Sequence, residues 1–159
     1  MTKKIKNNSF KKREELINFS LKQLNKPYKY AVKKKEIGKF FDCSSFTQYV
    51  YKHINIDIPR STILQAEVGK KIKPRNNKPP FFKAEDLKTG DLLFFKSTKG
   101  HYNKKFPEGI GHVLMYLGNN KFIHAGGSGS IKNQKVKLEK FDKIVNRKDF
   151  RVAKRIIKE

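Results

Sequence analysis

The chain has one cysteine, Cys43, and a pair of downstream histidines, His112 and His124, twelve positions apart. A lone cysteine cannot form an intramolecular disulfide, and one cysteine with two histidines falls short of a common zinc ligand set. One thiol and two imidazoles can instead supply a nucleophile, a general base and a group that orients the base. The alternative is a small buried core thiol, which is the commoner role of cysteine.

The residues around Cys43 favour a nucleophile. Asp42 precedes it, and apolar residues follow at positions 46, 50 and 54, a spacing that predicts a helix from Cys43 to about Ile54 with Asp42 as its cap. A thiol in the first turn of a helix lies near unpaired backbone N–H groups and the positive end of the helix dipole, which stabilise a thiolate. Asp42 opposes this effect as a like charge, so the nucleophile needs a histidine partner.

Both histidines lie in segments typical of strands. Residues 110–117 alternate, with His112, Leu114 and Tyr116 on one side and Val113, Met115 and Leu117 on the other, and 121–125 form a second short strand after a Gly-Asn-Asn turn. If the turn is centred on its first or second residue, His112 lies opposite or diagonal to His124, and the two imidazoles share a sheet face. The alternatives are a two-residue turn, which puts them on opposite faces, and a pair of ordinary half-exposed strand histidines.

A series of short motifs runs through most of the chain. They are, in order, Lys26-Pro27-Tyr28, Phe41-Asp42-Cys43-Ser44, Ile58-Pro59-Arg60-Ser61 with Gln65, residues 87–95, residues 111–118, Phe122-Ile123-His124-Ala125, and residues 150–155. In this order they resemble the NlpC-type family of papain-like cysteine peptidases, which cleave bacterial cell-wall peptides. Each motif is short, but the ordered set with the spacing of the two histidines is specific.

The resemblance implies roles for individual residues. Cys43 matches the family's nucleophile, His112 its general base, and His124 the third polar residue, which orients the base. The substrate-binding matches are Tyr28, beside the cysteine near the oxyanion site, and Asp42 and Ser44, which line the pocket for the substrate's free amino end. Three departures from the family pattern border the same cleft: Ser45 in place of a glycine, Ala31-Val32 in place of two glycines, and the basic stretch 33–36.

The composition fits one folded and strongly basic domain. The chain has 159 residues, with 38 Lys and Arg against 14 Asp and Glu, and a formal net charge of +24. We therefore expect a single catalytic domain over 1–159, with 1–8 as a flexible basic N-terminus. The charge has two interpretations, which are attraction to an anionic cell-wall polymer and a composition bias of the source genome.

Periodicity and turn residues predict helices first and strands afterwards. We expect helices at 10–24, 43–54 and 62–68, strands at 92–95, 110–117, 121–125, 131–138 and 151–157, and polar loops at 70–83 and 97–109. This order indicates an α+β fold with an antiparallel sheet. With the family resemblance, it gives a papain-like fold in which N-terminal helices carrying the cysteine pack on the sheet that carries the two histidines.

The remaining polar candidates fit structural roles better. His53 falls late on the Cys43 helix, where a surface position is expected, and His101 lies in a polar loop. Asp91 follows a glycine at a strand entry, which favours a turn-capping role. Arg60 fits either a salt bridge or a substrate contact.

We therefore expect a cysteine peptidase that hydrolyses amide bonds of peptidoglycan stem peptides through a thioester, at a bond such as D-glutamyl to a diamino acid, with no metal or organic cofactor. One alternative is a thiol hydrolase or acyltransferase on a non-wall amide or a lipid, although the unpermuted motif order argues against the lipid branch. Another is a basic module that binds an anionic polymer or nucleic acid. Such a module would have lost its Cys or His, so nucleic acid is disfavoured as a partner. The oligomeric state stays open.

Localisation signals are sparse. The chain contains no run of about 18 apolar residues, so no membrane span is expected. Its first residues are basic but lack the apolar run and cleavage site of a secretory signal. The expected substrate lies in the bacterial cell envelope, and both cytoplasmic storage and non-classical export stay open as routes to it.

Overall fold

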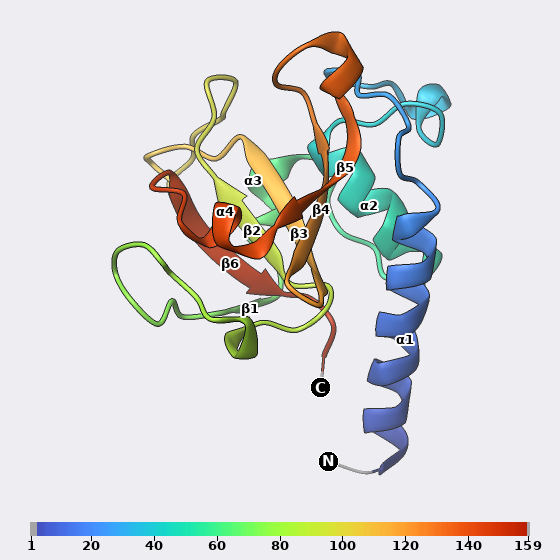
Figure 1. Cartoon of the computed structure of the whole chain (residues 1–159), viewed down its shortest axis with the longest axis vertical. Helices are drawn as coiled ribbons and strands as arrows, with labels where there is room; N and C mark the ends of the chain where they lie inside the picture. The colour runs from blue at the N-terminus through green and yellow to red at the C-terminus, as the bar shows by residue number, and fades with distance from the viewer. Residues whose placement is uncertain (1–2, 159) are drawn as a thin grey trace.

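A six-stranded antiparallel sheet forms the centre of the computed structural model, which describes residues 3–158 (Figure 1). Its strands lie in the order β1-β6-β2-β3-β4-β5, and each pairs antiparallel with its neighbours. The strands are β1 Lys70–Lys71, β2 Leu92–Phe95, β3 His112–Gly118, β4 Lys121–Gly126, β5 Lys135–Lys140 and β6 Phe150–Arg155. The α-helices are α1 Lys3–Leu21, α2 Cys43–His53, α3 Thr62–Gln65 and α4 Phe141–Val145, with single 3-10 turns at Lys34–Glu36, Ala84–Asp86 and Ile131–Asn133. The expected α+β fold is confirmed.

Helix α1 begins earlier than its sequence pattern predicted. It includes residues 3–8, which were expected to be a flexible basic segment, while residues 1–2 of that segment lie outside the described residues. Residues 3–8 contain neither Gly nor Pro and are rich in Lys, so a helix can propagate outward from its packed part. Ser9, the position before the predicted helix, lies inside α1, and its hydroxyl donates to the Lys158 carbonyl at 2.8 Å.

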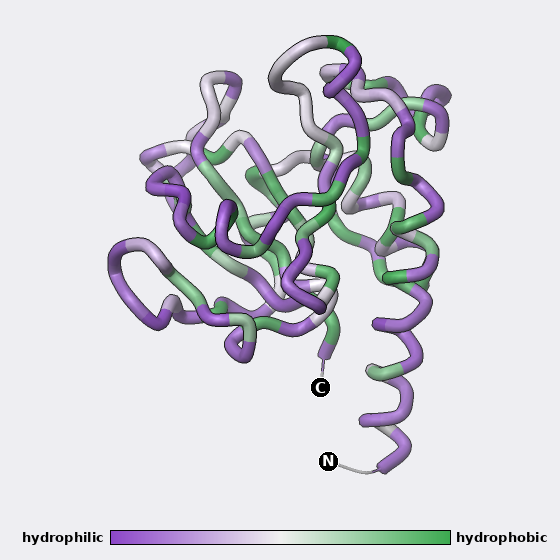
Figure 2. Tube along the Cα trace, viewed as in Figure 1, coloured by the Kyte–Doolittle hydropathy of each residue, from purple (hydrophilic) through white to green (hydrophobic). Residues whose placement is uncertain are grey.

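The C-terminal half of α1 anchors it to the domain. Leu16 is fully buried, whereas the side chain of Phe10 is 63% exposed. Figure 1 shows the N-terminal half of the helix standing clear of the sheet, and Figure 2 shows that half as mostly hydrophilic. The helix is therefore held by burial of its last turns against α2.

Helix α2 follows its sequence signals closely. The Asp42 carboxylate accepts from the Ser45 backbone N–H at 2.8 Å, and the Asp42 backbone N–H donates to the Ser45 hydroxyl at 3.0 Å. This reciprocal capping box fixes the first turn, where the thiol sits. Phe46 and Val50 are fully buried on the predicted apolar face. Ser45, where the resembled family usually has glycine, therefore has a structural function in this chain.

The sheet has a hydrophobic cluster on each face. On one face, Val113, Met115 and Ile123 pack with buried residues of α1 and α2. On the other face, Leu114, Tyr116 and Phe122 pack with Phe141 and Ile144 of α4 and with Phe81 and Phe82. Each fully buried aromatic or branched side chain stabilises the fold by about 1.5–3 kcal/mol. Both faces are therefore covered, and the sheet's orientation relative to α2 is fixed by close packing.

The hairpin of β3 and β4 has one of the predicted registers. Met115 pairs with Ile123 and Tyr116 with Phe122, and the register shifts at the turn before Gly118. Gly118, Asn119 and Asn120 all have positive φ, which Gly and Asn adopt at least cost. Continuing the register by one step makes His112 the diagonal neighbour of His124 on the same face, as predicted.

The periphery differs more from the sequence expectations. The expected loop 70–83 contributes the short edge strand β1, and α4 was not predicted. β5 extends to Lys140, two residues beyond its expected end, which brings Glu139 into the sheet. Among residues 3–158, no helix is both long and apolar enough to cross a membrane.

Candidate active site

One cleft of about 840 Å³ brings together every residue that the sequence singled out for catalysis or binding. Its lining includes Tyr28, Asp42, Cys43, Ser44, His112 and His124. The start of α2 supplies the cysteine, and the start of β3 and the end of β4 supply the two histidines. Residues that are far apart in the chain thus face one space.

Cys43 is the first residue of α2 and only 8% exposed. Its Sγ lies 3.5 Å from Thr62 Oγ1 and 3.9 Å from the Gly111 carbonyl oxygen. Burial raises the pKa of the thiol above its usual value, although the Thr62 hydroxyl and the backbone N–H groups of Val113 and Ser44 act in the opposite direction. Burial therefore opposes the stabilisation of a thiolate that the helix start would provide.

The two imidazoles are in direct contact. His112 Nε2 and His124 Nδ1 are 2.8 Å apart, and the rings are nearly perpendicular at 79°. Burial lowers the pKa of His112 well below its ordinary value, and it also lowers the pKa of His124. At neutral pH both rings are therefore uncharged, and the pair can accept a proton rather than already holding one.

Glu139 completes this group and was missed by the sequence reasoning. Its Oε1 lies 3.2 Å from His124 Nε2, and its Oε2 accepts from Lys143 Nζ at 3.1 Å. The hydrogen bond with His124 lowers the pKa of Glu139 to about 2. The signal that could have identified it is the alternation of β5, which puts Lys137 opposite His124 and Glu139 two pairs further along, opposite Phe122 and on the same face.

The Cys43 thiol and the His112 ring line one cleft at the beginning of β3. α2 packs on the sheet face of Val113, whereas alternation puts His112 on the face of Leu114. The Cys43 thiol contacts the peptide groups on both sides of His112, namely the Gly111 carbonyl and the Val113 N–H. Among the described residues no hydrogen bond joins the thiol to the imidazole, although both line the cleft.

Asp42 and Ser44 form a polar cluster with Arg60 at the edge of the cleft. Arg60 Nη2 lies 2.7 Å from Asp42 Oδ2, and Nη1 donates to the Ser44 hydroxyl at 2.9 Å. Arg60 Nη2 also donates to the Val32 carbonyl at 3.1 Å. Arg60 therefore forms the salt bridge that was one of its two expected roles. The Asp42 carboxylate is partly neutralised before any ligand arrives.

Tyr28 lies against the glycine-rich segment that follows β4. A Cβ on Gly127 would lie 2.4 Å from Tyr28 Cε1, so the ring requires glycine at this position. Burial raises the pKa of Tyr28 to about 12, and its hydroxyl stays protonated as a hydrogen-bond donor. Tyr28 is thus a neutral donor beside Cys43, as the oxyanion role requires.

The other polar candidates have structural partners. His53 is exposed and stacks on the Phe19 ring at 3.8 Å. Asp91 accepts from the Lys88 backbone N–H at 2.7 Å and pairs with Arg155, which confirms its turn-capping role. His101 lines the cleft from the loop before β3. Across residues 3–158, no group of three or more His, Cys, Asp or Glu side chains is arranged to hold a metal ion.

Comparison with known proteins gives one consistent result. Residues 25–148 match the NlpC/P60 family. The murein DD-endopeptidase MepS/murein LD-carboxypeptidase of Escherichia coli K12 is 34% identical over 94 residues, which cover 58% of this chain and 40% of that protein. The gamma-D-glutamyl-L-lysine dipeptidyl-peptidase of Bacillus cereus is 33% identical over 112 residues, which cover 70% of this chain and 28% of that protein. The chain thus spans less than half the length of these curated relatives.

Solved structures agree with the fold. An NlpC/P60 family protein from Bacillus cereus superimposes with a TM-score of 0.66 at 27% identity, covering 92% of this chain and 40% of that chain. The NlpC/p60 domain of the peptidoglycan hydrolase SagA superimposes with a TM-score of 0.62 at 27% identity, covering 91% of this chain and 98% of that domain. The expected papain-like arrangement of helices and sheet is confirmed by these likenesses.

Proposed function

The chain belongs to the NlpC/P60 family, and from this premise we propose that it is a cysteine peptidase that hydrolyses amide bonds in peptidoglycan stem peptides. The observation that carries the proposal is the juxtaposition of a buried thiol at the start of α2 with a hydrogen-bonded histidine pair in one cleft. The names of the relatives, a murein endopeptidase and a D-glutamyl-lysine peptidase, support a substrate of this class.

In the proposed reaction, His112 takes the proton of the Cys43 thiol as the sulfur attacks the amide carbonyl carbon. The C–N bond breaks, the leaving amine receives the proton from His112, and the acyl group stays on Cys43 as a thioester. A water molecule, deprotonated by His112, then hydrolyses the thioester and restores the thiol. Burial favours the neutral form of both the Cys43 thiol and the His112 ring in the resting structure.

The oxyanion that forms during attack needs hydrogen-bond donors. We assign this role to the Cys43 backbone N–H at the start of α2 and to the Tyr28 hydroxyl, which stays protonated. His124 orients His112 through the 2.8 Å contact between their rings. Together these groups supply a nucleophile, a base, an orienting group and a donor pair.

We assign recognition of the substrate's free amino end to Asp42 and Ser44. Arg60 already pairs with Asp42, so an incoming ammonium group would share the carboxylate with the guanidinium. The Ser44 hydroxyl, which accepts from Arg60, offers a second acceptor at the same place. Of the departures from the family pattern, Ala31 lines the cleft, whereas Val32, residues 33–36 and Ser45 are not among its lining residues.

The proposed scissile bond is the one between D-glutamate and a diamino acid. The gamma-D-glutamyl-L-lysine dipeptidyl-peptidase of Bacillus cereus supports this choice, since its match covers a larger share of this chain than that of the murein DD-endopeptidase. The competing possibility is cleavage of the D,D bond between two stem peptides. Product masses distinguish the two.

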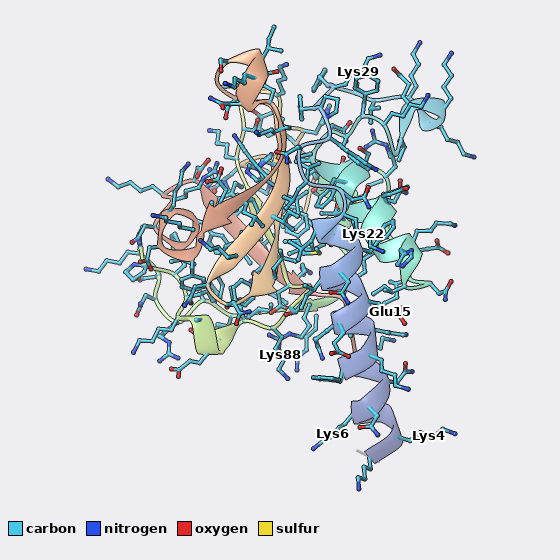
Figure 3. All side chains as sticks on the ribbon, turned by 45° about the vertical axis from the view of Figure 1, so that its right-hand side comes forward. Lys4, Lys6, Glu15, Lys22, Lys29 and Lys88 are labelled. Carbon is cyan, nitrogen blue, oxygen red and sulfur yellow. The ribbon has the colours of Figure 1, made fainter. Side chains whose placement is uncertain are left out.

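We also propose that the net charge of +24 helps the domain to associate with anionic polymers of the bacterial cell envelope, where its substrate lies. Figure 3 shows Lys4 and Lys6 projecting from the N-terminal end of α1 into solvent. Attraction of this kind weakens with added salt, because the Debye length falls from about 10 Å at 0.1 M to about 3 Å at 1 M. Cleavage of whole walls should therefore fall with salt more than cleavage of a small stem peptide.

The decisive experiment is mass spectrometry of defined muropeptides after incubation with the protein. The expected products are fragments cut after D-glutamate, and the matched Cys43→Ala variant should give no product while unfolding at a similar temperature. Product formation by folded Cys43→Ala protein would end the cysteine-peptidase proposal. Products cut at the D,D bond would keep the peptidase and change its bond specificity.

A further inference from the structure

Glu139 extends the two imidazoles into a chain of three groups. His112 Nε2 lies 2.8 Å from His124 Nδ1, and His124 Nε2 lies 3.2 Å from Glu139 Oε1. The three residues come from three adjacent strands, β3, β4 and β5. His124 is only 7% exposed, so water competes weakly for these contacts. No motif in the sequence assigned a function to Glu139.

The chemistry of the donors and acceptors fixes where the protons lie. An ionised carboxylate can only accept a hydrogen bond. The contact with Glu139 therefore requires neutral His124 to carry its proton on Nε2. His124 Nδ1 is then a bare acceptor, and it takes the Nε2–H of His112. The remaining nitrogen of His112, Nδ1, carries no proton. It is the basic atom that remains for the Cys43 thiol.

We propose that Glu139 is a positioning residue that selects the tautomers of both imidazoles and so leaves His112 Nδ1 free to take the thiol proton. This inference rests on the proposed function for the roles of Cys43 and His112. When Nδ1 takes the proton from sulfur, His112 becomes an imidazolium and Cys43 a thiolate. Glu139 stays ionised and stabilises that positive charge through His124, as a carboxylate behind a catalytic histidine does in other hydrolases.

The charges around the histidines make this carboxylate important. Lys137 lies opposite His124 on β5, and Arg147 follows α4; both lower the pKa of the two histidines. Arg147 is paired with Asp149 at 2.7 Å, and Lys143 of α4 is paired with Glu139 itself. On the α2 side, the Cys43 thiol contacts the Gly111 carbonyl and the Val113 backbone N–H, which flank His112. Glu139 is thus an anion in direct contact with His124 in cationic surroundings.

A purely structural alternative exists for Glu139. Its ion pair with Lys143 links the end of β5 to α4 at i,i+4 spacing, and this contact could be all that the residue contributes. That alternative predicts that removing Lys143 has the same effect as removing Glu139. The tautomer proposal predicts effects of opposite sign, because one change removes an anion near the histidines and the other removes a cation.

The test compares wild type with Glu139→Gln, Glu139→Asp and Lys143→Met, with Asp57→Asn as the control at an exposed carboxylate that pairs with Lys52. The first measurement is the rate of Cys43 alkylation by iodoacetamide as a function of pH, which needs no peptide substrate. The second is kcat on a defined stem peptide. The third is the protonated nitrogen of His112 and His124, read from two-bond ¹H–¹⁵N correlations of the folded protein.

Glu139→Gln should lower kcat by about 10- to 100-fold, the usual cost of losing a group that orients a functional histidine. Its alkylation should slow near pH 7, and the acid limb of the pH profile should move to lower pH, because the imidazolium has lost its anion. Its amide N–H can also donate to His124 Nε2, which shifts the proton to Nδ1. Glu139→Asp keeps the negative charge, so its kcat should lie between those of wild type and Glu139→Gln. Lys143→Met should move the acid limb of the pH profile to higher pH. Asp57→Asn should change neither kcat nor the pH profile.

Three results would overturn the proposal. They are a wild-type spectrum with His124 protonated at Nδ1, a Glu139→Gln variant with an unshifted pH profile, and a Lys143→Met variant that reproduces Glu139→Gln. The wild-type spectrum decides even if the Gln variant does not fold. Failure of the peptidase proposal looks different: no stem peptide is cut, while the alkylation profiles still shift as stated.

Discussion

The two walls of the cleft are held in place by different kinds of contact. The helix wall, made of Asp42, Cys43 and Ser44 with Arg60 and Thr62, relies on a capping box within one turn and on a salt bridge from a nearby segment. The sheet wall, made of His112, His124 and Glu139, relies on the pairing of β3 with β4 and of β4 with β5. One wall is set by neighbours in sequence and the other by strand register.

The walls also differ in charge. The helix wall keeps an ionised carboxylate and pairs it with Arg60 at the cleft edge. The sheet wall buries two neutral histidines and puts its carboxylate behind them, away from the thiol. In the proposed mechanism the buried thiol loses its proton to a histidine of the sheet wall, and the start of its own helix contributes less.

Removing the base should have a larger effect than removing its orienting partner. His112→Ala should reduce kcat by about a hundred- to ten-thousand-fold, which is the usual contribution of a general base. His124→Asn should be milder, because an amide can still hold the His112 ring. The measurement is kcat on a defined stem peptide with both variants checked for folding. Equal losses for the two variants would mean that the histidines act as one unit and that the ranking is wrong.

The buried thiol should label slowly at low pH. Because burial raises its pKa, Cys43 should have a smaller thiolate fraction at pH 6 than a free thiol, and iodoacetamide should label it more slowly. The rate should rise as the pH rises toward the pKa of the thiol. N-acetylcysteine under the same conditions is the reference. Labelling faster than the reference at pH 6 would show that the helix start or a protonated histidine dominates over burial.

The sheet wall should make the fold sensitive to acid. The folded pKa values of His112 and His124 are lowered, so below about pH 6.5 the unfolded chain binds more protons than the folded protein. The free energy of unfolding should then fall as the pH drops from 6.5 to 5, and His112, whose pKa lies well below its ordinary value, should contribute most of the fall. Glu139, whose pKa is about 2, loses its stabilising contribution only below about pH 4.5 and does not disturb this window.

Urea unfolding at pH 5 and pH 7 measures this dependence. His124→Asn should show a smaller difference between the two pH values than wild type, because one buried neutral histidine is gone. His53→Asn, a change at the exposed histidine outside the cleft, should keep the wild-type difference. If His124→Asn also keeps it, then acid does not destabilise the fold through the sheet wall.

The sequence predicted the helix wall well because its signals are local. Asp42 as a cap and apolar residues every fourth position placed Cys43 at a helix start, and the structure has that helix. Local pattern could not show the burial that raises the pKa of the thiol, because the groups packed around Cys43 come from α3 and from the start of β3, which are distant in sequence. The local sequence pattern therefore predicts where Cys43 lies in its helix, whereas the burial of its thiol depends on tertiary packing.

The sheet wall was only partly predictable. The Gly-Asn-Asn turn left registers open that put the two histidines on the same face or on opposite faces; a same-face register is observed, and it brings His112 and His124 together. Glu139 escaped notice because its strand was expected to end at residue 138 and because its contact requires the pairing of β4 with β5. Helix α4 follows this strand directly and was missed with it. A charged residue at a strand end gives no sign in sequence that it faces a buried histidine.

The smallest effect is expected at Ser45, the position where the helix wall departs from the family's usual glycine. Its hydroxyl accepts from the Asp42 backbone N–H at 3.0 Å, and a glycine would lose this hydrogen bond. The glycine would keep the other half of the capping box, in which the backbone N–H of residue 45 donates to the Asp42 carboxylate at 2.8 Å. Glycine also costs about 1 kcal/mol within a helix. Ser45→Gly should therefore lower the free energy of unfolding by about 1–2 kcal/mol, measured by urea, and leave kcat nearly unchanged. Ser45→Ala removes the same hydroxyl without the glycine penalty and should lose less. A fall in kcat greater than the loss of folded protein would place Ser45 among the groups that position the thiol, and the helix wall would then be more than a scaffold.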